Sequence, residues 1–299
     1  MPRMKPTRRL LLGIFFSILV VGVNSMVALA STAPGLGTAA SYAILAGTTV
    51  TNTGNSVIAG DIGISPGSAC TGFPAPCTGG GPGTLSGAIH AGDAQALQAK
   101  SDLTAAYGVA ASSPCNFNKT GVNLGGQTLT PGTYCQTTAP TLTGTLTLSG
   151  NGVFIFQIGS TLVTAPGATV AFINGAQPCN VFWQVSSSAT LDTTTTFVGT
   201  IMALTSISLN NGVTIAGRAL ARNGQVSLIN DRITAPTTCL PTSVAGPTPT
   251  PAPAGAPAGG GGAPQGAGFP WILALVAGIL AGAGAVGAGL TIRGGRRTQ

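Results

Sequence analysis

The chain has 299 residues and a formal net charge of +7, but only 6% of its residues are charged and none is Glu. Its 46 Gly and 21 Pro favour turn-rich β structure over helical bundles. Between residues 31 and 240, five basic residues balance five Asp, so the basic stripe of a nucleic-acid-binding protein is missing. We therefore expect no nucleic-acid partner.

The first 30 residues have the pattern of a secretory signal peptide. Arg8 and Arg9 precede an apolar stretch from Leu10 to Val23, and Ala28-Leu29-Ala30 supplies a small-x-small cleavage site. The pattern predicts a signal peptide over residues 1–30 and an exported domain over residues 31–240. An uncleaved N-terminal anchor is the alternative.

Residues 88–111 form the only long segment of this domain with a helical pattern. The spacing predicts a narrow stripe of mostly small residues along one side, a cap at Ser86 and an end before Pro114. Such a stripe allows a helix to lie close against a neighbouring surface. We expect the helix to cover an apolar face of the domain.

Internal repeats predict the architecture of the rest of the domain. "FVGTIMAL" (197–204) aligns with "IAGRALAR" (215–222) at an offset of 18, and Leu191 reaches Leu209 by 18 residues and Leu228 by 19 more. A period near 18, with short strands and Gly/Asn turns, is typical of one coil of a parallel β-helix. The fold class is thus mainly β, a stacked parallel solenoid with one long helix alongside.

The strands of the repeat are of two kinds. "VFIFQI", "VFWQV" and "TIMAL" are apolar on both sides, which indicates a covered face. In the other strands Thr190, Ser208 and Ser227 alternate with apolar neighbours and are expected to point outward. "TLTGTLTL" (141–148) also alternates, with its Thr residues expected on one side. One face is therefore predicted to be open and lined by hydroxyls.

All six Cys lie in the exported domain, at positions 70, 77, 115, 135, 179 and 239. An even number in an oxidising compartment predicts disulfides, but six Cys allow 15 pairings. Cys70 and Cys77 can close a small loop. The spacing lacks a paired CxxC zinc pattern, so we expect no metal site.

The pattern of the C-terminal part predicts a membrane anchor. Residues 241–268 are an uncharged Pro/Gly-rich linker, predicted to be disordered. Residues 269–292 are mainly apolar and long enough to span a bilayer, and the basic tail 293–299 predicts a cytoplasmic C-terminus. Gly278 and Gly282 predict weak self-association of this span. The expected location is the extracellular face of the membrane.

The residues that carry chemistry are too sparse to predict an enzyme. The single His, His90, has no nucleophile motif nearby and is interpreted as a residue at the helix start. Asp192 and Asp231 are the only carboxylates in the repeats, and glycoside cleavage needs two closely opposed carboxyls. We expect no cofactor and no catalytic residues.

The remaining feature is the Thr/Ser/Asn surface, including four consecutive Thr at 193–196. A level, nearly uncharged array of methyl and hydroxyl groups can hold water in a regular pattern. Its rigidity limits the entropy lost on contact with an ordered solid such as ice. An ordinary soluble β-helix face, where Thr is common by propensity, is the alternative interpretation.

Several ordered motifs resemble the microbial ice-binding protein family. They include "LGTAASYAILAGTTVTNTGNSVIAGDIGISPG" (36–67), "QALQAKSDLTAAY" (95–107), "VFIFQIGSTL", "VFWQVSSSATL" and "IAGRALARNGQVSLINDRI", and together they cover nearly all of residues 36–236. The resemblance implies a right-handed discontinuous β-helix flanked by one long helix, adsorption to ice and no cofactor. A Thr-x-x-Thr/Asn pattern of some members matches Thr193 to Thr196 and, more loosely, Asn211 to Thr214. The third coil departs from this pattern, with Asp231 and Arg232.

The leading hypothesis is an exported, membrane-tethered antifreeze-type protein that adsorbs to ice, restrains ice growth or recrystallisation, or holds a cell to ice. The alternatives are a surface adhesin or glycan-binding module without ice activity, and a polysaccharide-cleaving enzyme using Asp192. The predicted ice-contacting residues are Thr190, Thr193, Thr194, Thr195, Thr196, Ser208, Asn211, Thr214 and Ser227.

Overall fold

The computed structural model describes residues 31–237. By its internal contacts the chain divides into two units, residues 1–246 and 247–299. The predicted signal peptide (1–30), linker (241–268), membrane span (269–292) and basic tail (293–299) lie outside the described residues, as does the end of the predicted 31–240 domain.

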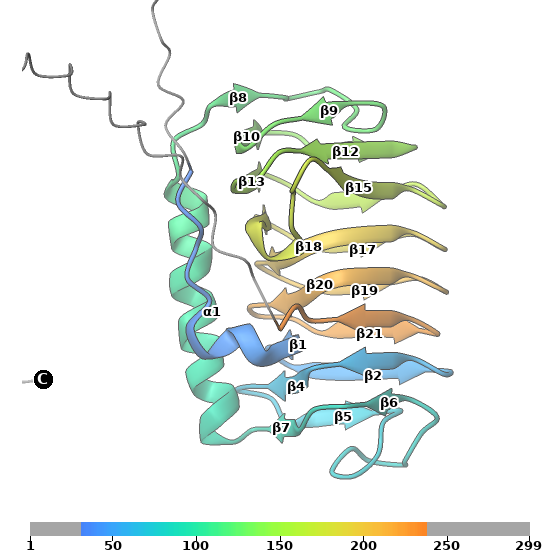
Figure 1. Ribbon diagram of the computed structural model, residues 1–299. Coiled ribbons are helices and arrows are strands. Elements are labelled where there is room, and N and C mark those ends of the chain that lie inside the picture. The colour runs from blue at the N-terminus through green and yellow to red at the C-terminus, as the bar shows by residue number, and fades with distance from the viewer. Residues whose placement is uncertain (1–30, 238–299) are drawn as a thin grey trace, which may run out of the picture. The chain divides into compact units, whose positions relative to one another are not determined.

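The strands of the described domain form a stacked coil with three faces (Figure 1). The first, the helix face, contains β1 (Tyr42–Ala46), β4 (Asp61–Ile64), β7 (Ile89–Ala91), β8 (Phe117–Asn118), β10 (Gly132–Gln136), β13 (Phe154–Ile158), β16 (Val181–Val185) and the second halves of β18 (Thr196–Ala203) and β20 (Thr214–Ala221). The second, the seven-strand face, contains β2 (Thr49–Thr53), β5 (Ala69–Thr71), β11 (Thr141–Leu142), β14 (Leu162–Thr164), β17 (Ala189–Leu191), β19 (Ile207–Leu209) and β21 (Val226–Ile229). The third face contains β3 (Val57–Ala59), β6 (Thr84–Leu85), β9 (Thr128–Leu129), β12 (Thr145–Ser149), β15 (Thr169–Ile173), β22 (Arg232–Thr234) and the first halves of β18 and β20.

The register between coils follows the repeat in the sequence. Strand β18 pairs in parallel with β20 at an offset of 18, with Phe197 opposite Ile215, and β19 pairs with β21 at an offset of 19. The strands β18 and β20 each turn from the third face to the helix face at a glycine. At Gly199 the backbone φ is +102°, and an added Cβ would lie 2.6 Å from the carbonyl oxygen of Val181, so only Gly fits this corner. The predicted parallel solenoid is confirmed.

The stacking order of the coils differs from their order in the sequence. After β7, helix α1 (Ala94–Ser112) carries the chain along the whole stack to β8 at the opposite end (Figure 1). The chain then coils back, and its last coil pairs with its first: β20 with β1, β21 with β2, and β22 with β3. The β-helix is therefore discontinuous, as the family resemblance implies.

A buried arginine helps to join these two coils. Arg218, on β20, donates to the carbonyl oxygen of Ala40 from both Nε (2.9 Å) and Nη2 (2.6 Å), and from Nη2 to that of Pro236 (3.0 Å). Ala40 belongs to the short 3-10 helix η1 (Gly37–Ser41) before β1. Burial lowers the pKa of Arg218 to about 10. A cation with this pKa stays charged at neutral pH, so the hydrogen bonds are charge-assisted.

Helix α1 covers the apolar strands, as predicted, but begins later than residue 88. Residues 89–91 form β7, and Asp93, not Ser86, is the cap, because its carboxylate accepts from the backbone N–H of Ala96 at 2.8 Å. The buried stripe of the helix packs on β1, β13, β16, β18 and β20 and contains Ala96, Ala99, Lys100, Leu103, Ala106, Tyr107 and Ala110. The only charged member, Lys100, donates to the carbonyl oxygens of Ala221 and Arg222.

The interior of the coil is apolar and cross-linked. Rings of Tyr134, Phe156 and Trp183 stack through consecutive coils, with 3.9 Å between the ring centroids of Phe156 and Trp183, and the ring of Phe197 packs against that of Trp183 at a tilt of 45°. Disulfides join Cys70 to Cys77 and Cys115 to Cys135, and Cys179 is disulfide-bonded as well. The prediction that Cys70 and Cys77 close a small loop is confirmed. Short strands such as β17 and β19 therefore pack against a buried apolar interior that is cross-linked by disulfides.

Candidate functional site

The seven-strand face presents one outward side chain from each of its strands in an unbroken column. The register places Thr190 opposite Ser208 and Ser208 opposite Ser227, as the repeat predicts. Val163 continues the column on one side and Thr51 on the other. In stacking order the column contains Thr141, Val163, Thr190, Ser208, Ser227, Thr51 and Thr71. With about 4.8 Å between neighbouring strands, it extends over roughly 29 Å.

The hydroxyl groups of this column are free to bind water. Apolar neighbours such as Ala189, Leu191, Ile207 and Leu209 point inward and are buried, which holds each strand in place. Within the described residues, no protein group forms a hydrogen bond with the side-chain hydroxyl of any Thr or Ser in the column. Each of these hydroxyls can donate one hydrogen bond and accept others. Six of the seven strands therefore display an unoccupied hydroxyl on a fixed backbone.

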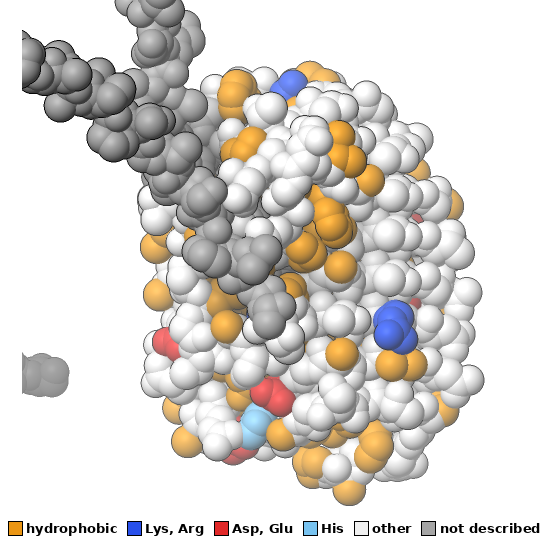
Figure 2. Space-filling view, in the orientation of Figure 1, with side chains coloured by type: hydrophobic (Ala, Val, Ile, Leu, Met, Phe, Trp, Pro, Cys, Tyr) orange, Lys and Arg blue, Asp and Glu red, His pale blue; other side chains and the backbone are white. Residues whose placement is uncertain are grey.

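Little charge lies near the column. The neighbouring outward positions on β2, β17, β19 and β21 carry uncharged residues, except for Asp192 after β17. The Asn210 side-chain amide and the Thr193 backbone N–H donate to Asp192, and these bonds hold the pKa of its carboxyl below the usual range. In Figure 2 the surface in view is mostly uncharged, with few basic or acidic side chains.

The corner between the seven-strand face and the third face carries three of the predicted residues, Thr193, Thr194 and Asn211. Thr194 has a φ of +57°, and its backbone N–H donates to the carbonyl oxygen of Asn211 at 3.0 Å. The side chain of Asn211 accepts from the Asn230 amide at 2.8 Å. Asn230 Oδ1 in turn accepts from the backbone N–H of Asn55. The corner is a hydrogen-bonded ridge along the stack.

Thr195 does not belong to this surface. Its exposed fraction is 0%, and its Oγ1 lies 2.9 Å from Oγ1 of Thr164, which is also buried. The backbone N–H of Asp192 donates to the same Thr164 oxygen at 2.8 Å. The expectation that all four Thr of the run face outward is therefore wrong for Thr195. The tight turn Asp192–Thr195, closed by a hydrogen bond from Thr195 N–H to the Asp192 carbonyl, points this side chain into the coil.

Thr196 and Thr214 lie opposite each other on adjacent strands, as the repeat predicts, but on the third face. The predicted surface is thus divided between two faces and the ridge that separates them. The same correction applies to "TLTGTLTL". Gly144, with a φ of +85°, turns the chain there, so that Thr141 lies on the seven-strand face, whereas Thr145 and Thr147 lie on the third face.

Four residues of the column were not predicted as site residues from the sequence: Thr51, Thr71, Thr141 and Val163. Thr51 and Thr71 belong to the first two coils, which join the column only because the last coil pairs with the first. The alternation in "TVTNT" (49–53) is the local signal for an outward Thr51. No repeat offset connects it with Ser227.

The residues considered for catalysis do not form a carboxylate pair. Asp231 is 2% exposed and accepts from the backbone N–H groups of Val213 (2.8 Å) and Ile229 (2.7 Å). Burial raises the pKa of Asp231 to about 7. Because Asp231 points into the coil and Asp192 lies on the ridge side, the two carboxyls do not flank an open cleft. The geometry for two-carboxylate glycoside cleavage is missing.

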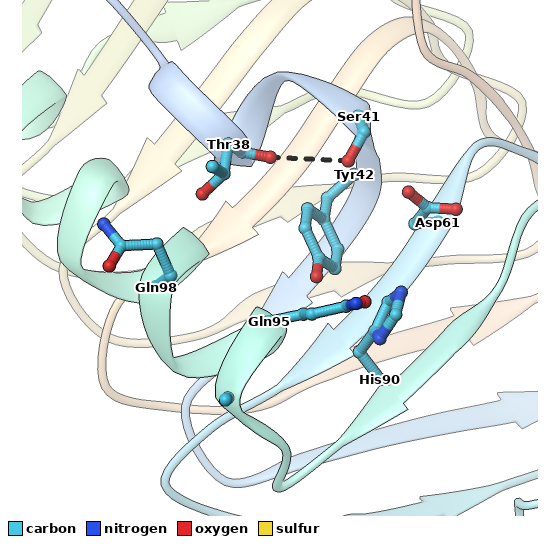
Figure 3. A pocket seen from close by; sticks show the side chains of 8 residues that line it. Thr38, Ser41, Tyr42, Asp61, His90, Gln95 and Gln98 are labelled. Carbon is cyan, nitrogen blue, oxygen red and sulfur yellow. Dashed lines mark hydrogen bonds between the residues drawn. The ribbon is translucent and has the colours of Figure 1, made fainter.

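His90 lies in β7, not at the start of a helix, and lines a pocket of about 370 Å³ beside the N-terminus of α1. Figure 3 shows Tyr42, Asp61 and His90 around this pocket, with Gln95 reaching in from the helix. The imidazole Nδ1 of His90 is 2.8 Å from a carboxylate oxygen of Asp93, the helix cap. Burial raises the pKa of Tyr42 to about 12, so its hydroxyl stays protonated. Among residues 31–237 no group of three His, Cys, Asp or Glu could hold a metal ion.

Within residues 31–237 the structure contains no helix that is long and apolar enough to cross a membrane. The predicted span at 269–292 lies outside this range.

Comparisons with known proteins agree on one family. Residues 44–234 match the family model described as Ice-binding-like. An ice-binding protein of Nostoc sp. (strain HG1) is 48% identical over 203 residues, covering 66% of this chain and 72% of the relative. The crystal structure of an ice binding protein from an Antarctic biological consortium has a TM-score of 0.65 at 44% identity, covering 69% of this chain and 92% of that chain. The crystal structure of an ice-binding protein from the Antarctic ascomycete Antarctomyces psychrotrophicus has a TM-score of 0.65 at 35% identity, covering 69% of this chain and 100% of that chain.

Proposed function

Because the chain belongs to the ice-binding-like family, we propose that it adsorbs to ice through the seven-strand face. The names of its relatives and of the similar solved structures support ice as the partner. The observation that carries the assignment to this face is the unbroken column of outward side chains from Thr141 to Thr71 in stacking order, six of which carry a free hydroxyl.

The chemistry of the face suits a crystalline water surface. Each Thr brings a methyl group and a hydroxyl on one short, stiff stem, and each Ser brings a hydroxyl. Hydroxyls fixed at regular intervals can anchor a layer of ordered water, while the methyl groups exclude mobile water between them. The outward side chains are short and the five inner strands of the face are hydrogen-bonded on both sides, so contact with ice costs little conformational entropy. Adsorption in this manner restrains crystal growth and recrystallisation.

The predicted ridge residues Thr193, Thr194 and Asn211 extend the same surface at its edge. The hydrogen bonds of Asn211 with Asn230 and of Thr194 with the backbone hold these side chains in place. We assign them a supporting contact with ice beside the column of Thr190, Ser208 and Ser227.

The proposal includes an exported domain held at the membrane by residues 269–292. The signal-like pattern of residues 1–30 supports export, and the disulfides Cys70–Cys77 and Cys115–Cys135 suit an oxidising compartment. A cell carrying such a domain on a Pro/Gly-rich stalk could be held to ice. The distribution of the full-length chain between membrane and soluble fractions tests this part.

The test of the ice-binding face uses Ser208→Tyr in residues 31–240. This fragment keeps all six Cys, and the ascomycete structure, covered over 100% of its chain, shows that such a domain folds alone. Ser208 is central in the column and points outward, so Tyr projects into solvent without disturbing the core. We expect thermal hysteresis and the faceting of single ice crystals to be abolished, because the ring prevents close contact of the face with ice.

The matched control is Leu97→Tyr on the outer side of α1, where Leu97 is 61% exposed. It adds the same side chain far from the seven-strand face and should leave hysteresis unchanged. Circular dichroism and urea unfolding establish that both variants are folded. Full hysteresis in folded Ser208→Tyr would refute the assignment to this face. Smooth, unfaceted crystals with the unchanged fragment would refute ice binding and favour the adhesin alternative.

A further inference from the structure

The pocket beside the N-terminus of α1, called here the His90 pocket, contains a buried tyrosine whose hydroxyl the protein does not use. The pocket has a volume of about 370 Å³, and Tyr42, Asp61, His90 and Gln95 lie around it (Figure 3). Tyr42 is only 3% exposed, and among residues 31–237 no group forms a hydrogen bond with its hydroxyl. Figure 3 shows this hydroxyl pointing toward Gln95, inside the pocket. Because buried polar groups are normally hydrogen-bonded, the Tyr42 hydroxyl indicates a position for a ligand atom.

The packing around Tyr42 fixes this hydroxyl in place. An added Cβ at Gly63 of β4 would lie 2.6 Å from Cε1 of Tyr42, so only Gly leaves room for the ring. The ring of His90 packs edge-on against that of Tyr42, with 5.7 Å between the ring centroids. Tyr42 also belongs to the buried cluster that contains Ala99 and Leu103 of α1. The pocket is therefore formed before any ligand binds, which lowers the entropy cost of binding.

The polar groups that face the pocket can all accept hydrogen bonds. One carboxylate oxygen of Asp61, Oδ1, accepts from the backbone N–H of Ala88 at 2.9 Å, and within the described residues the other has no partner. The side-chain amide of Gln95 likewise has no partner among residues 31–237. A tyrosine hydroxyl and an amide carbonyl both accept, and a carboxylate only accepts. A ligand that carries only donors therefore satisfies all three groups.

The charge around the pocket is negative. Three of the five Asp between residues 31 and 240 lie at it: Asp61 lines it, Asp93 pairs with His90 at 2.8 Å, and Asp102 accepts from the side-chain amide of Gln98 at 2.9 Å. Among the described residues, no Lys or Arg lines the pocket. Figure 2 shows acidic side chains beside the single histidine. This field favours a cation and disfavours an anion.

The start of helix α1 by itself favours an anion, but the protein already supplies one. Asp93 accepts from the backbone N–H of Ala96 at 2.8 Å, and this bond holds the pKa of the Asp93 carboxyl below its usual range. Hydrogen bonds from the hydroxyl and the backbone N–H of Thr38, both 2.7 Å long, have the same effect on the pKa of Asp102. Both carboxylates are therefore charged at neutral pH, and the negative field is maintained.

We propose that the His90 pocket binds a primary ammonium group carried on a short alkyl chain. An ammonium group has three N–H donors and no acceptor. These donors meet the hydroxyl oxygen of Tyr42, the free carboxylate oxygen of Asp61 and the side-chain carbonyl of Gln95, while the alkyl chain packs beside Ala94. Both a small free amine and the Lys side chain of another protein have this chemistry. The site is separate from the proposed ice-binding face, because its strands, β1, β4 and β7, belong to the helix face.

The first experiment titrates residues 31–240 with butylammonium chloride and measures heat by calorimetry. Butanol and sodium butyrate are the matched controls, since they have the same alkyl chain with a neutral or an anionic end. We expect butylammonium to bind and the two controls not to bind. A Gly-Lys-Gly peptide with acetylated and amidated ends offers only a side-chain ammonium. Tighter binding of the peptide than of butylammonium identifies a protein partner, and the reverse order identifies a free amine.

Two variants test the residues that hold the ammonium group. Tyr42→Phe and Asp61→Asn should each weaken butylammonium binding at least about tenfold, because each removes a hydrogen bond to a charged group. The matched controls are Tyr134→Phe, near the opposite end of the stack, and Asp192→Asn, beside the seven-strand face, and both should keep the affinity. Circular dichroism establishes that all four variants are folded.

Tyr42→Phe also separates a binding role from a structural role. Since the Tyr42 hydroxyl has no partner in the protein, its removal should leave the urea unfolding midpoint unchanged or higher. Thermal hysteresis should stay unchanged in Tyr42→Phe and in Asp61→Asn, so failure of this site and failure of ice binding give different results.

Several outcomes would overturn the proposal. Equal binding of butanol and butylammonium would show an apolar cavity without ammonium recognition. Heat from calcium chloride but not from butylammonium would show a metal site instead. Unchanged affinity in folded Tyr42→Phe and Asp61→Asn would place the ammonium group elsewhere, and no binding of butylammonium or of the peptide would refute the site.

Discussion

The substitution Thr195→Val tests whether a buried Thr beneath the proposed ice-binding surface contributes to stability and not to ice adsorption. Thr195 lies in the middle of the four-Thr run, but its hydroxyl is buried and pairs with that of Thr164 at 2.9 Å. The Thr164 oxygen already accepts from the backbone N–H of Asp192, so its proton is available to Thr195. Val keeps the shape of Thr and removes this partner, together with the long hydrogen bond from Thr195 Oγ1 to the carbonyl oxygen of Ala165 at 3.5 Å. Thr164 is then left with a buried, unpaired donor.

An unpaired buried polar group of this kind costs about 1–3 kcal/mol. For a domain of this size, each kcal/mol lowers the melting temperature by roughly 2–4 °C. We therefore expect Thr195→Val to melt roughly 2–12 °C lower than the unchanged protein, by thermal or urea unfolding followed by circular dichroism. Near 0 °C the variant remains folded, and its ice adsorption should be unchanged because the outer surface is intact.

Ser208→Tyr should show the opposite pattern, with unchanged unfolding and no ice adsorption. The reasoning would be wrong if Thr195→Val unfolded within about 0.5 kcal/mol of the unchanged protein, the range of ordinary surface substitutions. It would also be wrong if folded Thr195→Val lost hysteresis, because that result would place the Thr195 hydroxyl in contact with ice.

Two further predictions concern stability and location. Burial raises the pKa of Asp231 to about 7, above its unfolded value of 3.8, so the folded state binds the proton more tightly than the unfolded state. The contribution of protonated Asp231 to the free energy of unfolding is therefore fully present below about pH 4 and is lost as the pH rises towards 7. Urea unfolding between pH 4 and 8 should therefore show that Asp231→Asn removes a loss of stability with rising pH, and parallel pH profiles for the two proteins would contradict this. For location, the full-length chain should stay with the membrane fraction after an alkaline wash, and deletion of residues 269–299 should release it; a full-length chain found only in the soluble fraction would argue against the anchor.

The local pattern of the sequence was sufficient to predict the coil and the side chains that point outward from it. Alternation in strands such as "ISL" and "VSL" identifies Ser208 and Ser227 as outward, since the burial of their neighbours leaves only one side for them. The offset of 18 or 19 residues then predicts which of them lie side by side. The small residues at Ala99, Ala106 and Ala110 likewise predict a helix that lies close to the apolar strands.

The turns were harder to predict, because a change of face depends on one or two backbone angles. Thr193 to Thr196 are four identical residues in the sequence, but in the structure Thr194 has a φ of +57° and the side chain of Thr195 points inward. As a result Thr196 begins a strand on another face. Gly144 has the same effect between Thr141 and Thr145. No periodic pattern contains this information, because residues in a turn follow neither the strand nor the helix period.

The repeats and the alternation were thus enough to predict a stacked parallel coil, a covering helix and rows of Thr and Ser pointing outward, because all of these depend on contacts within a coil or one repeat apart. The division of those rows between two faces, and the length of each row, depend on the three-dimensional path of the chain. Thr51 and Thr71 complete the first column because the last coil hydrogen-bonds to the first, a contact between segments about 175 residues apart. Pairing at that distance is governed by the path of the whole chain, which α1 reverses, and not by any pattern within a strand.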